Sequence, residues 1–310
     1  MIGGVLLVLV LQAGPARPGV PDRATLLSRA GDALQRGNRA EAKQLLATAG
    51  ERYGSVQAWL QLARVESQEG RATEAMRALA AARRLAPNAE DVLAAYAELS
   101  LRVRAPVQAI VTLEALTRMY PTDARYAYLL GVGLMTAGDT PAALEVLRKA
   151  NALEPDRPLT LLALGLACNN QKLYTDARPL LRRALDLDPQ SIQALAALAE
   201  AEAGDGDVAA AERDTTRVLG REPANATANL VLGMVRITQQ RYAEARDALL
   251  AAVSADPRSP KPEYQLSLVY ARMGDQASAD RHLDQYREKL RAMEAAAKAV
   301  RVTGPGGPQR

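Results

Sequence analysis

A spacing of 34 residues recurs through most of this 310-residue chain and limits its fold more than any other feature of the sequence. Prolines keep this spacing at Pro87, Pro121, Pro155, Pro189, Pro223 and Pro257. Alanines keep it at Ala75, Ala109, Ala143, Ala177, Ala211, Ala245 and Ala279. A fixed period of about 20 to 50 residues is typical of proteins in which each repeat packs only against its neighbours. The sequence therefore predicts one solenoid, although the length alone would suggest about two globular domains.

Each repeat has the pattern of two helices, as residues 124–157 illustrate. The first half carries a helical stripe of small and apolar residues at Ala127, Leu130, Gly131 and Leu134. The second half carries another stripe at Ala143, Leu147, Ala150 and Leu153. Gly138 stands between the stripes, where glycine ends a helix, and Pro155 follows the second, where proline stops one. The unit therefore predicts an antiparallel helix pair.

Small and large residues alternate at fixed positions, counted from the start of each unit. The eighth position is always small, as Ala63, Ala97, Gly131, Gly165, Ala199, Gly233 and Ser267. The twenty-fourth is usually leucine, as Leu46, Leu79, Leu113, Leu147, Leu181, Leu249 and Leu283. Facing small residues let two helix backbones approach closely, and a larger side chain there would overpack the pair. Residues 192–225 depart from this pattern, with Thr215 at the leucine position and a loose turn expected over 204–207. This repeat is predicted to be locally less stable, or alternatively to act as a hinge or contact point.

Residues that start helices follow the recurrent prolines. Asp123, Ser191, Asn225 and Ser259 each come two residues after a proline, where their side chains are expected to cap first helices. The third repeat has Arg104 where a turn glycine is expected, and Pro106 then suits a first helical turn.

Together these positions resemble the tetratricopeptide repeat: a small residue at 8, Ala at 20, an apolar residue at 24 and Pro at 32. The resemblance covers residues 23–293 in eight copies, with departures such as a single Trp59 and no Phe. It implies an all-α, right-handed superhelical solenoid of antiparallel helix pairs. It also implies a non-enzymatic scaffold for protein–protein interaction.

In this family the first helices line the concave face, so the resemblance also predicts a binding groove for a protein or peptide partner. The exposed positions there are the second, fifth, ninth and twelfth of each repeat. In repeats 4 to 8 the predicted groove residues are Tyr128, Val132, Met135, Leu162, Leu166, Leu230, Met234, Ile237, Tyr264 and Leu268, with Asn169 as a backbone clamp. The alternative is that many of these apolar residues pack between adjacent first helices.

Residues 1–22 are interpreted as a signal-like apolar segment and linker. The apolar run from Ile2 to Ala13 is too short to span a bilayer as a helix, and small residues follow it. Cleavage is expected after Ala13 or Ala16, although no Lys or Arg precedes the run. The prediction is an exported, periplasmic or envelope-associated protein. The alternatives are an uncleaved anchor, or a cytoplasmic protein with a wrongly assigned start.

The second helix of the last repeat is expected to extend beyond the 34-residue repeat length, because no proline stops it. Its apolar residues follow a heptad pattern at Ala279, Leu283, Tyr286, Leu290, Met293, Ala297 and Val300. Two interpretations stay open: a capping helix over the last repeat, or a coiled coil that forms a homodimer through residues 279–300. Residues 294–302 extend this helix, and residues 303–310 are expected to be a disordered tail.

Composition excludes several classes of function. Most of the net charge of +4 lies after Asp280, whereas a nucleic-acid-binding solenoid would carry basic residues along its groove. Membrane contact is expected only through the N-terminal segment or the basic C-terminal tail. The single His282, expected to be exposed, and the single Cys168, expected in the core, cannot form a metal cluster or a nucleophilic pair. The sequence predicts no metal, no cofactor and no enzyme.

Two functions remain: a peptide-binding scaffold, or a structural subunit of a cell-envelope assembly for secretion, pili or polysaccharide export.

Overall fold

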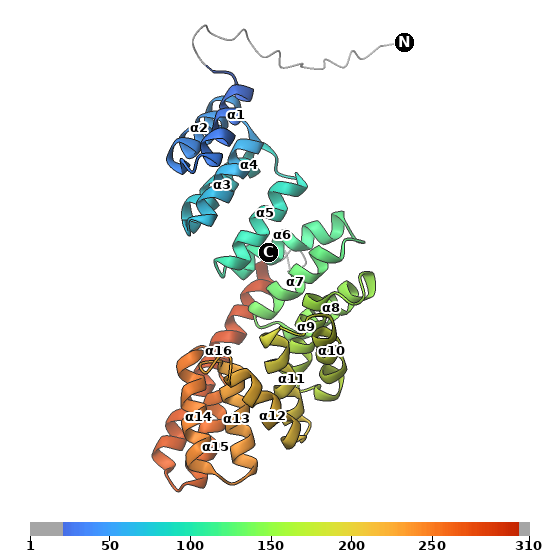
Figure 1. Ribbon diagram of the computed structural model, residues 1–310, viewed down its shortest axis with the longest axis vertical. Helices are drawn as coiled ribbons and strands as arrows, with labels where there is room; N and C mark the ends of the chain where they lie inside the picture. The colour runs from blue at the N-terminus through green and yellow to red at the C-terminus, as the bar shows by residue number, and fades with distance from the viewer. Residues whose placement is uncertain (1–20, 304–310) are drawn as a thin grey trace. The chain divides into compact units, whose positions relative to one another are not determined.

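The computed structural model describes residues 21–303, except for the side chains of 296, 297 and 299–303. Within this range the chain forms sixteen helices and no strand, as Figure 1 shows. The all-α class and the solenoid of helix pairs are therefore confirmed. The described residues do not include residues 1–20 of the predicted signal segment and linker, nor residues 304–310 of the predicted tail.

Every repeat has one first helix and one second helix. The first helices are α1 (Arg23–Gln35), α3 (Val56–Gln68), α5 (Glu90–Arg102), α7 (Ala124–Thr136), α9 (Pro158–Asn170), α11 (Ile192–Gly204), α13 (Ala226–Thr238) and α15 (Lys261–Arg272). The second helices are α2 (Arg39–Tyr53), α4 (Ala72–Leu85), α6 (Pro106–Met119), α8 (Thr140–Leu153), α10 (Tyr174–Leu187), α12 (Val208–Leu219), α14 (Tyr242–Ala255) and α16 (Gln276–Thr303).

Contacts divide the chain into two compact units, Met1–Ala95 and Tyr96–Arg310, with the boundary inside α5. In unit 1, helices α1 to α4 pack successively against one another. In unit 2, each helix from α7 to α16 packs against the one before it. The first helices α7, α9, α11, α13 and α15 also contact their neighbours in this series and form the first-helix face of unit 2. A single solenoid through all eight repeats stays a prediction.

The eighth and twenty-fourth positions are in close contact in the repeats that have glycine at the eighth position. A Cβ atom on Gly131 would lie 2.5 Å from Cγ of Leu147, and one on Gly165 would lie 2.6 Å from Cγ of Leu181. Both leucines are fully buried. The small residue therefore provides the space that the leucine fills, as the spacing predicts.

The predicted helix ends are mostly confirmed. Gly138 adopts a left-handed backbone with φ of +86° after α7, and Arg104 adopts φ of +55° at the corresponding turn of repeat 3. The side chains of Asp123, Ser191 and Asn225 accept hydrogen bonds from backbone amides in the first turns of α7, α11 and α13. These bonds satisfy amides that have no partner within the helix.

Ser259 does not cap a helix, so that prediction is wrong. Helix α15 begins at Lys261, and the residue before it is Pro260, which has no side-chain acceptor. The Ser259 carbonyl instead accepts a hydrogen bond from Nζ of Lys289 in α16, at 3.3 Å. The last repeat is therefore secured by its partner helix and not by a local cap.

The turn over 204–207 is also not loose. Arg178 of α10 forms ion pairs with both Asp205 and Asp207, and the Asp207 amide donates to the Glu202 carbonyl at 2.8 Å. A structural weakness of this repeat lies instead at Thr215, which is fully buried and whose hydroxyl has no hydrogen-bond partner among the described atoms. Its role as a hinge stays a prediction.

Helix α16 has 28 residues, and its first half covers the last repeat. The carboxylate of Glu263 in α15 lies 2.7 Å from Nδ1 of His282 and 2.6 Å from Nζ of Lys289. The His282 side chain is only 12% exposed, so the expectation of an exposed histidine is wrong. These contacts favour the capping interpretation of α16. The homodimer stays a prediction.

Two glycine-to-alanine substitutions test the packing between the eighth and twenty-fourth positions. Gly165→Ala is expected to lower the free energy of unfolding by about 1–3 kcal/mol, because the new methyl group collides with Leu181. Gly31→Ala in α1 is the control, since nothing lies within 4 Å of its Cβ position. It is expected to raise stability by about 0.5–1 kcal/mol through helix propensity. Urea unfolding followed by circular dichroism measures both changes, and equal shifts in the same direction would contradict the packing argument.

Candidate functional site

Two adjoining hollows lie on the first-helix face, among α11, α13 and α15. One has a volume of about 170 Å³, the other about 350 Å³, and both are lined by Ile237 and Thr238. We call the two together the repeat 6–8 groove. Its other lining residues are Ala203, Val208, Met234, Val235, Gln240, Tyr242, Gln265, Leu268, Val269 and Arg272.

Helical spacing explains why α13 lines the groove. Leu230 and Val231 are directed into the core, and Met234 and Ile237, which follow at helical intervals, are half-buried. Met234 and Ile237 also pack against the buried cluster that contains Leu249 and Leu266. The groove residues Met234 and Ile237 therefore pack directly on the hydrophobic core. Leu268 on α15 is 42% exposed and gives the groove an accessible apolar rim.

Charged residues lie at both ends of α15. Lys261, its first residue, forms an ion pair with Glu200 of α11 at 2.5 Å, which joins repeat 8 to repeat 6. Arg272, its last residue, is exposed and lines the 350 Å³ hollow of the repeat 6–8 groove. Its guanidinium has no ion-pair or hydrogen-bond partner in the described part of the chain. The groove therefore carries one unpaired positive charge, which is available to an acidic group.

The predicted groove residues differ in burial. Tyr264 and Leu268 are exposed, and Tyr128, Val132, Met135, Leu166, Met234 and Ile237 are half-buried. Leu162, Asn169 and Leu230 are buried. The structure brings Met234, Ile237 and Leu268 together in the repeat 6–8 groove. A binding role for any member of the set stays a prediction.

Three predicted groove residues have contacts within the protein. The Asn169 amide donates to the Ala197 carbonyl at 2.8 Å, so this amide joins α9 to α11. The Arg157 guanidinium lies 5.7 Å from the ring centroid of Tyr128, and burial raises the pKa of the Tyr128 phenol. The ring of Tyr264 packs against Tyr286 of α16, with 5.3 Å between the ring centroids.

Sequence reasoning missed several residues around the groove. Glu200 occupies the ninth position of repeat 6, so applying the same rule to that repeat would have found it. Arg272 follows the twelfth position of repeat 8, and only its basic side chain at a helix end was a signal. Gln265 and Thr238 gave no signal, because polar residues at these positions also occur on solvent-exposed helix surfaces.

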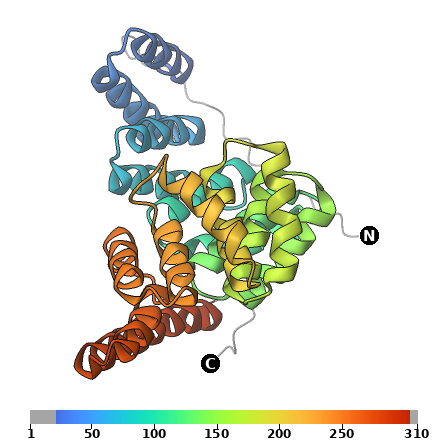
Figure 2. The ribbon, with the colours of Figure 1, turned by 60° about the horizontal axis from the view of Figure 1, so that its bottom comes forward.

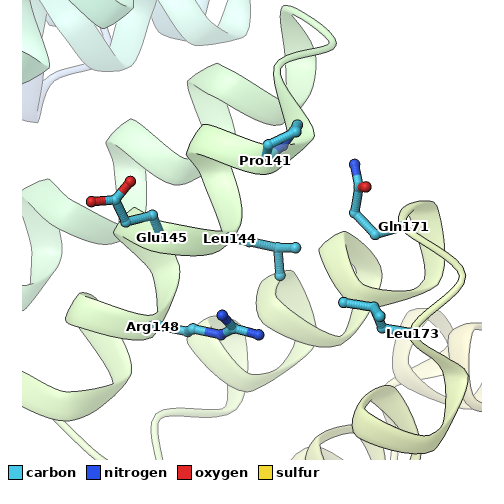
Figure 3. A pocket seen from close by; sticks show the side chains of 6 residues that line it. All are labelled: Pro141, Leu144, Glu145, Arg148, Gln171 and Leu173. Carbon is cyan, nitrogen blue, oxygen red and sulfur yellow. The ribbon is translucent and has the colours of Figure 1, made fainter.

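A larger hollow of about 450 Å³ lies between α8 and the turn that joins α9 to α10 (Figure 3). Leu144 and Leu173 point toward each other there, Arg148 extends into the same space, and Glu145 points away from it. The Leu173 side chain is 38% exposed. No residue of this α8–α10 hollow was predicted from the sequence. It is a second candidate surface for a partner.

Cys168 is buried in α9, as predicted. Burial raises the pKa of its thiol, and the nearby Asp176 carboxylate raises it further, against an opposing effect of Arg148. Among the described residues, no three His, Cys, Asp or Glu side chains gather as a metal site requires. In the same part of the chain, no helix has both the length and the apolar character of a membrane span.

Helix pairs that repeat every 34 residues and pack in series define a repeat solenoid. The Tetratricopeptide repeat family matches residues 66–132, 133–192 and 196–260. The chain therefore belongs to the tetratricopeptide repeat family, whose members are protein-interaction scaffolds.

Two longer curated proteins resemble this chain, one over about half of it and the other over most of it. A TPR repeat-containing protein of Pseudomonas aeruginosa is 29% identical over 166 residues, which cover 53% of this chain and 28% of that protein. Cellulose synthase 2 operon protein C of Komagataeibacter xylinus is 28% identical over 292 residues, which cover 92% of this chain and 21% of that protein. The chain thus spans less than a third of the length of either relative.

Solved structures share the fold. A tetratricopeptide repeat protein of Parabacteroides merdae matches with a TM-score of 0.62 at 15% identity, over 80% of this chain and 98% of that one. The structure of pilF from Pseudomonas aeruginosa matches with a TM-score of 0.53 at 20% identity, over 69% of this chain and 97% of that one.

The burial of Cys168 predicts low reactivity of its thiol. In the folded protein it is expected to react with Ellman's reagent about tenfold or more slowly than in urea, because access and thiolate formation are both reduced. The reaction is expected to accelerate only above the ordinary thiol range near pH 8.5, since the folded pKa is raised. Equal rates in the folded and unfolded protein would contradict this placement.

Proposed function

We propose that this protein is a non-enzymatic scaffold that binds a segment of a partner protein in the first-helix groove of repeats 4 to 8, with the repeat 6–8 groove as the principal contact. The observation that carries the proposal is the pair of hollows lined mainly by α11, α13 and α15. They place Met234, Ile237 and Leu268 beside one another. Apolar grooves with a few polar groups on their rims suit peptide segments, and methionine adapts to varied side chains.

The groove also suggests the chemistry of the bound segment. Apolar side chains fit Met234, Ile237 and Leu268, while the amides of Gln240 and Gln265 offer hydrogen bonds. The unpaired Arg272 favours a carboxylate at the corresponding end of the segment. We therefore expect a peptide or helix with a few apolar residues followed or preceded by Asp or Glu. Tetratricopeptide folds are typically non-catalytic, and the proposal assigns no reaction to the chain.

The second proposal is a structural subunit or adaptor of a cell-envelope assembly that uses the outer surface and α16. The apolar run from Ile2 to Ala13 favours it. So does the resemblance, over most of this chain, to a protein named for a cellulose synthase operon. Under this proposal the protein is exported or envelope-associated. The α8–α10 hollow is then a candidate contact, because it is formed by residues of α8 and the α9–α10 turn.

Two leucine substitutions of matched exposure separate these surfaces. Partners recovered by a tagged pull-down from the native cell are purified, and their affinity for each variant is measured. Leu268→Glu is expected to weaken binding by about thirtyfold, as a buried contact worth about 2 kcal/mol would require. Leu173→Glu, at nearly the same exposure in the α8–α10 hollow, is expected to leave binding unchanged. The reverse pattern would contradict the repeat 6–8 groove and place the contact at the other hollow.

The envelope proposal is tested by fractionating the native cell and sequencing the mature N-terminus. Cleavage near Ala13 or Ala16, together with recovery in the envelope fraction, is the expected result. An intact Met1 in the cytosolic fraction would contradict export, and the peptide-binding proposal would stand without it.

A further inference from the structure

Two acidic side chains occupy facing positions inside the helix pair of repeat 6. Glu202 of α11 and Asp214 of α12 are both buried. The residues two periods later, Tyr270 and His282, stack with 5.3 Å between ring centroids, so these two positions of a repeat meet. Helices α11 and α12 pack against each other, and Figures 1 and 2 show them side by side. Repeat 6 thus has two carboxyl groups where repeat 8 has two stacked rings.

The cations nearest to this carboxyl pair lie at its exposed margin. Nη2 of Arg182 in α10 is 3.5 Å from Oε1 of Glu202. Nη1 of Arg217 in α12 is 3.0 Å from Oδ1 of Asp214. More than half of each arginine side chain is exposed, so water screens both positive charges. The second carboxyl oxygen of Glu202, Oε2, is buried and has no hydrogen-bond partner among the described atoms. An ionised Glu202 is therefore incompletely compensated.

Two neighbouring helices supply little further compensation to Glu202. Arg178 of α10 attracts the Glu202 carboxylate, but its guanidinium forms ion pairs with Asp205 and Asp207. Helix α9 has no charged residue, and its titratable side chain is the buried Cys168.

The remaining charged groups around α11 are engaged elsewhere. Arg236, the charged residue of α13, pairs with Glu212. Glu200 of α11 itself pairs with Lys261 of α15. The ring of Tyr174 in α10 lies against the end of α11, at Gly204. None of these side chains provides Glu202 with an ion pair.

Burial and the neighbouring carboxylate act on Glu202 in the same direction. Burial is the larger cause and Asp214 the next, and together they raise the pKa of the Glu202 carboxyl against the opposing effects of Arg182 and Arg178. Because this pKa is raised in the folded protein, protonation of Glu202 favours folding. The contribution is complete below the ordinary glutamate value of 4.5 and is lost as pH rises through the folded pKa.

The same helix pair forms part of the repeat 6–8 groove. Ala203, which follows Glu202 in α11, and Val208, the first residue of α12, line the 170 Å³ hollow. Both also pack against a buried cluster that includes Val231 and Val235 of α13. A change in the separation of α11 and α12 would therefore move the wall of this hollow directly.

Packing gives this helix pair less resistance to such a change than its neighbours have. Leu181 and Leu249 fill the twenty-fourth position in repeats 5 and 7, and both are fully buried. Thr215 takes this position in repeat 6, where its hydroxyl is buried without a hydrogen-bond partner among the described atoms. A threonine buries less apolar surface than leucine, and an unpaired hydroxyl weakens the contact further.

We propose that Glu202 and Asp214 form a pH-sensitive switch in repeat 6. When the pair shares one proton, α11 and α12 pack closely and the 170 Å³ hollow keeps the shape that accepts a partner segment. When that proton is released to solvent, the two carboxylates repel each other, the helix pair loosens and the wall of the hollow moves. The proposal rests on the proposed function of the repeat 6–8 groove, and it names the regulation of that site.

The chain offers a matched pair of substitutions for the test. Glu202→Gln keeps the shape of the side chain but cannot ionise. Glu66→Gln is the control, because Glu66 is buried at the same position of repeat 2. There the neighbours are cations: Nζ of Lys43 and Nε of Arg71 each lie 3.6 Å from its Oε2. Removing the charge is therefore expected to tighten the helix pair of repeat 6 and to loosen that of repeat 2.

Amide hydrogen exchange, followed by mass spectrometry, measures the opening of each helix pair in the full-length protein without any partner. Protection is corrected for intrinsic exchange and compared at pH 5 and pH 8. In the parent, protection of α11 and α12 is expected to fall by about threefold or more at pH 8. Glu202→Gln is expected to remove this fall. Glu66→Gln is expected to keep it, and to lower the protection of α3 and α4 at both pH values.

Asp214→Asn removes the repulsion from the other side and is expected to act as Glu202→Gln does, so the test does not depend on one variant. The single His282 lies in repeat 8 and is present in every variant, so its effect cancels in the comparison. Equal protection of repeat 6 at both pH values in the parent would overturn the switch. So would a loss at pH 8 that persists in both amide variants.

The link to the groove is measured separately, with the partner recovered by the tagged pull-down. The ratio of the parent's affinity to that of Glu202→Gln is expected to fall by about threefold or more from pH 5 to pH 8. A constant ratio would overturn the link between the switch and the groove. Hydrogen exchange needs no partner, so the switch and the peptide-binding function can fail independently.

Discussion

Close approach of two helices within each repeat is the interaction on which the rest of this structure depends. A leucine at the twenty-fourth position occupies the space left by a small residue at the eighth, with separations that leave no room for a methyl group at Gly131 or Gly165. Since dispersion and apolar burial both fall off once a gap opens, this contact decides how tightly each pair packs. Repeat 6 lacks the leucine of this contact. Thr215 stands in its place, buried and with a hydroxyl that has no hydrogen-bond partner among the described atoms. Ion pairs from Arg178 stabilise the neighbouring turn.

Stacking of such pairs creates the surfaces on which function depends. In unit 2 the first helices contact one another, so residues 34 positions apart line a common face. The repeat 6–8 groove forms there from α11, α13 and α15, together with the first residues of α12 and α14. The Glu200–Lys261 ion pair joins α11 to α15. Helix α16 then ties the last repeat to α6. The same stacking thus forms the groove and brings the chain's own C-terminal helix back to an earlier repeat.

Particular residues show how far the sequence could be read. The helix pairs, their turns and most caps followed from local chemistry, because a left-handed turn or an N-cap is decided within a few residues. Ser259 and His282 were misjudged because Lys289 and Glu263, which lie 19 to 30 residues away, determine their surroundings. Asn169 has the burial of a core residue because its amide reaches Ala197 of the next repeat. The only local signal for Arg272 was a basic side chain at a helix end, and the α8–α10 hollow had no local signal.

The sequence by itself determined the family, the register of the repeats and the apolar character of the first helices. It could do so because the same residue types recur every 34 residues in successive copies. Tertiary structure alone decided which of those apolar residues are accessible. Met234, Ile237 and Leu268 line hollows, whereas Leu162 and Leu230 are buried. It also decided which surface α16 contacts, since a heptad pattern does not specify the surface that a helix packs against. The physical reason is that helix periodicity depends on neighbours along the chain, whereas exposure depends on how successive repeats are packed against one another.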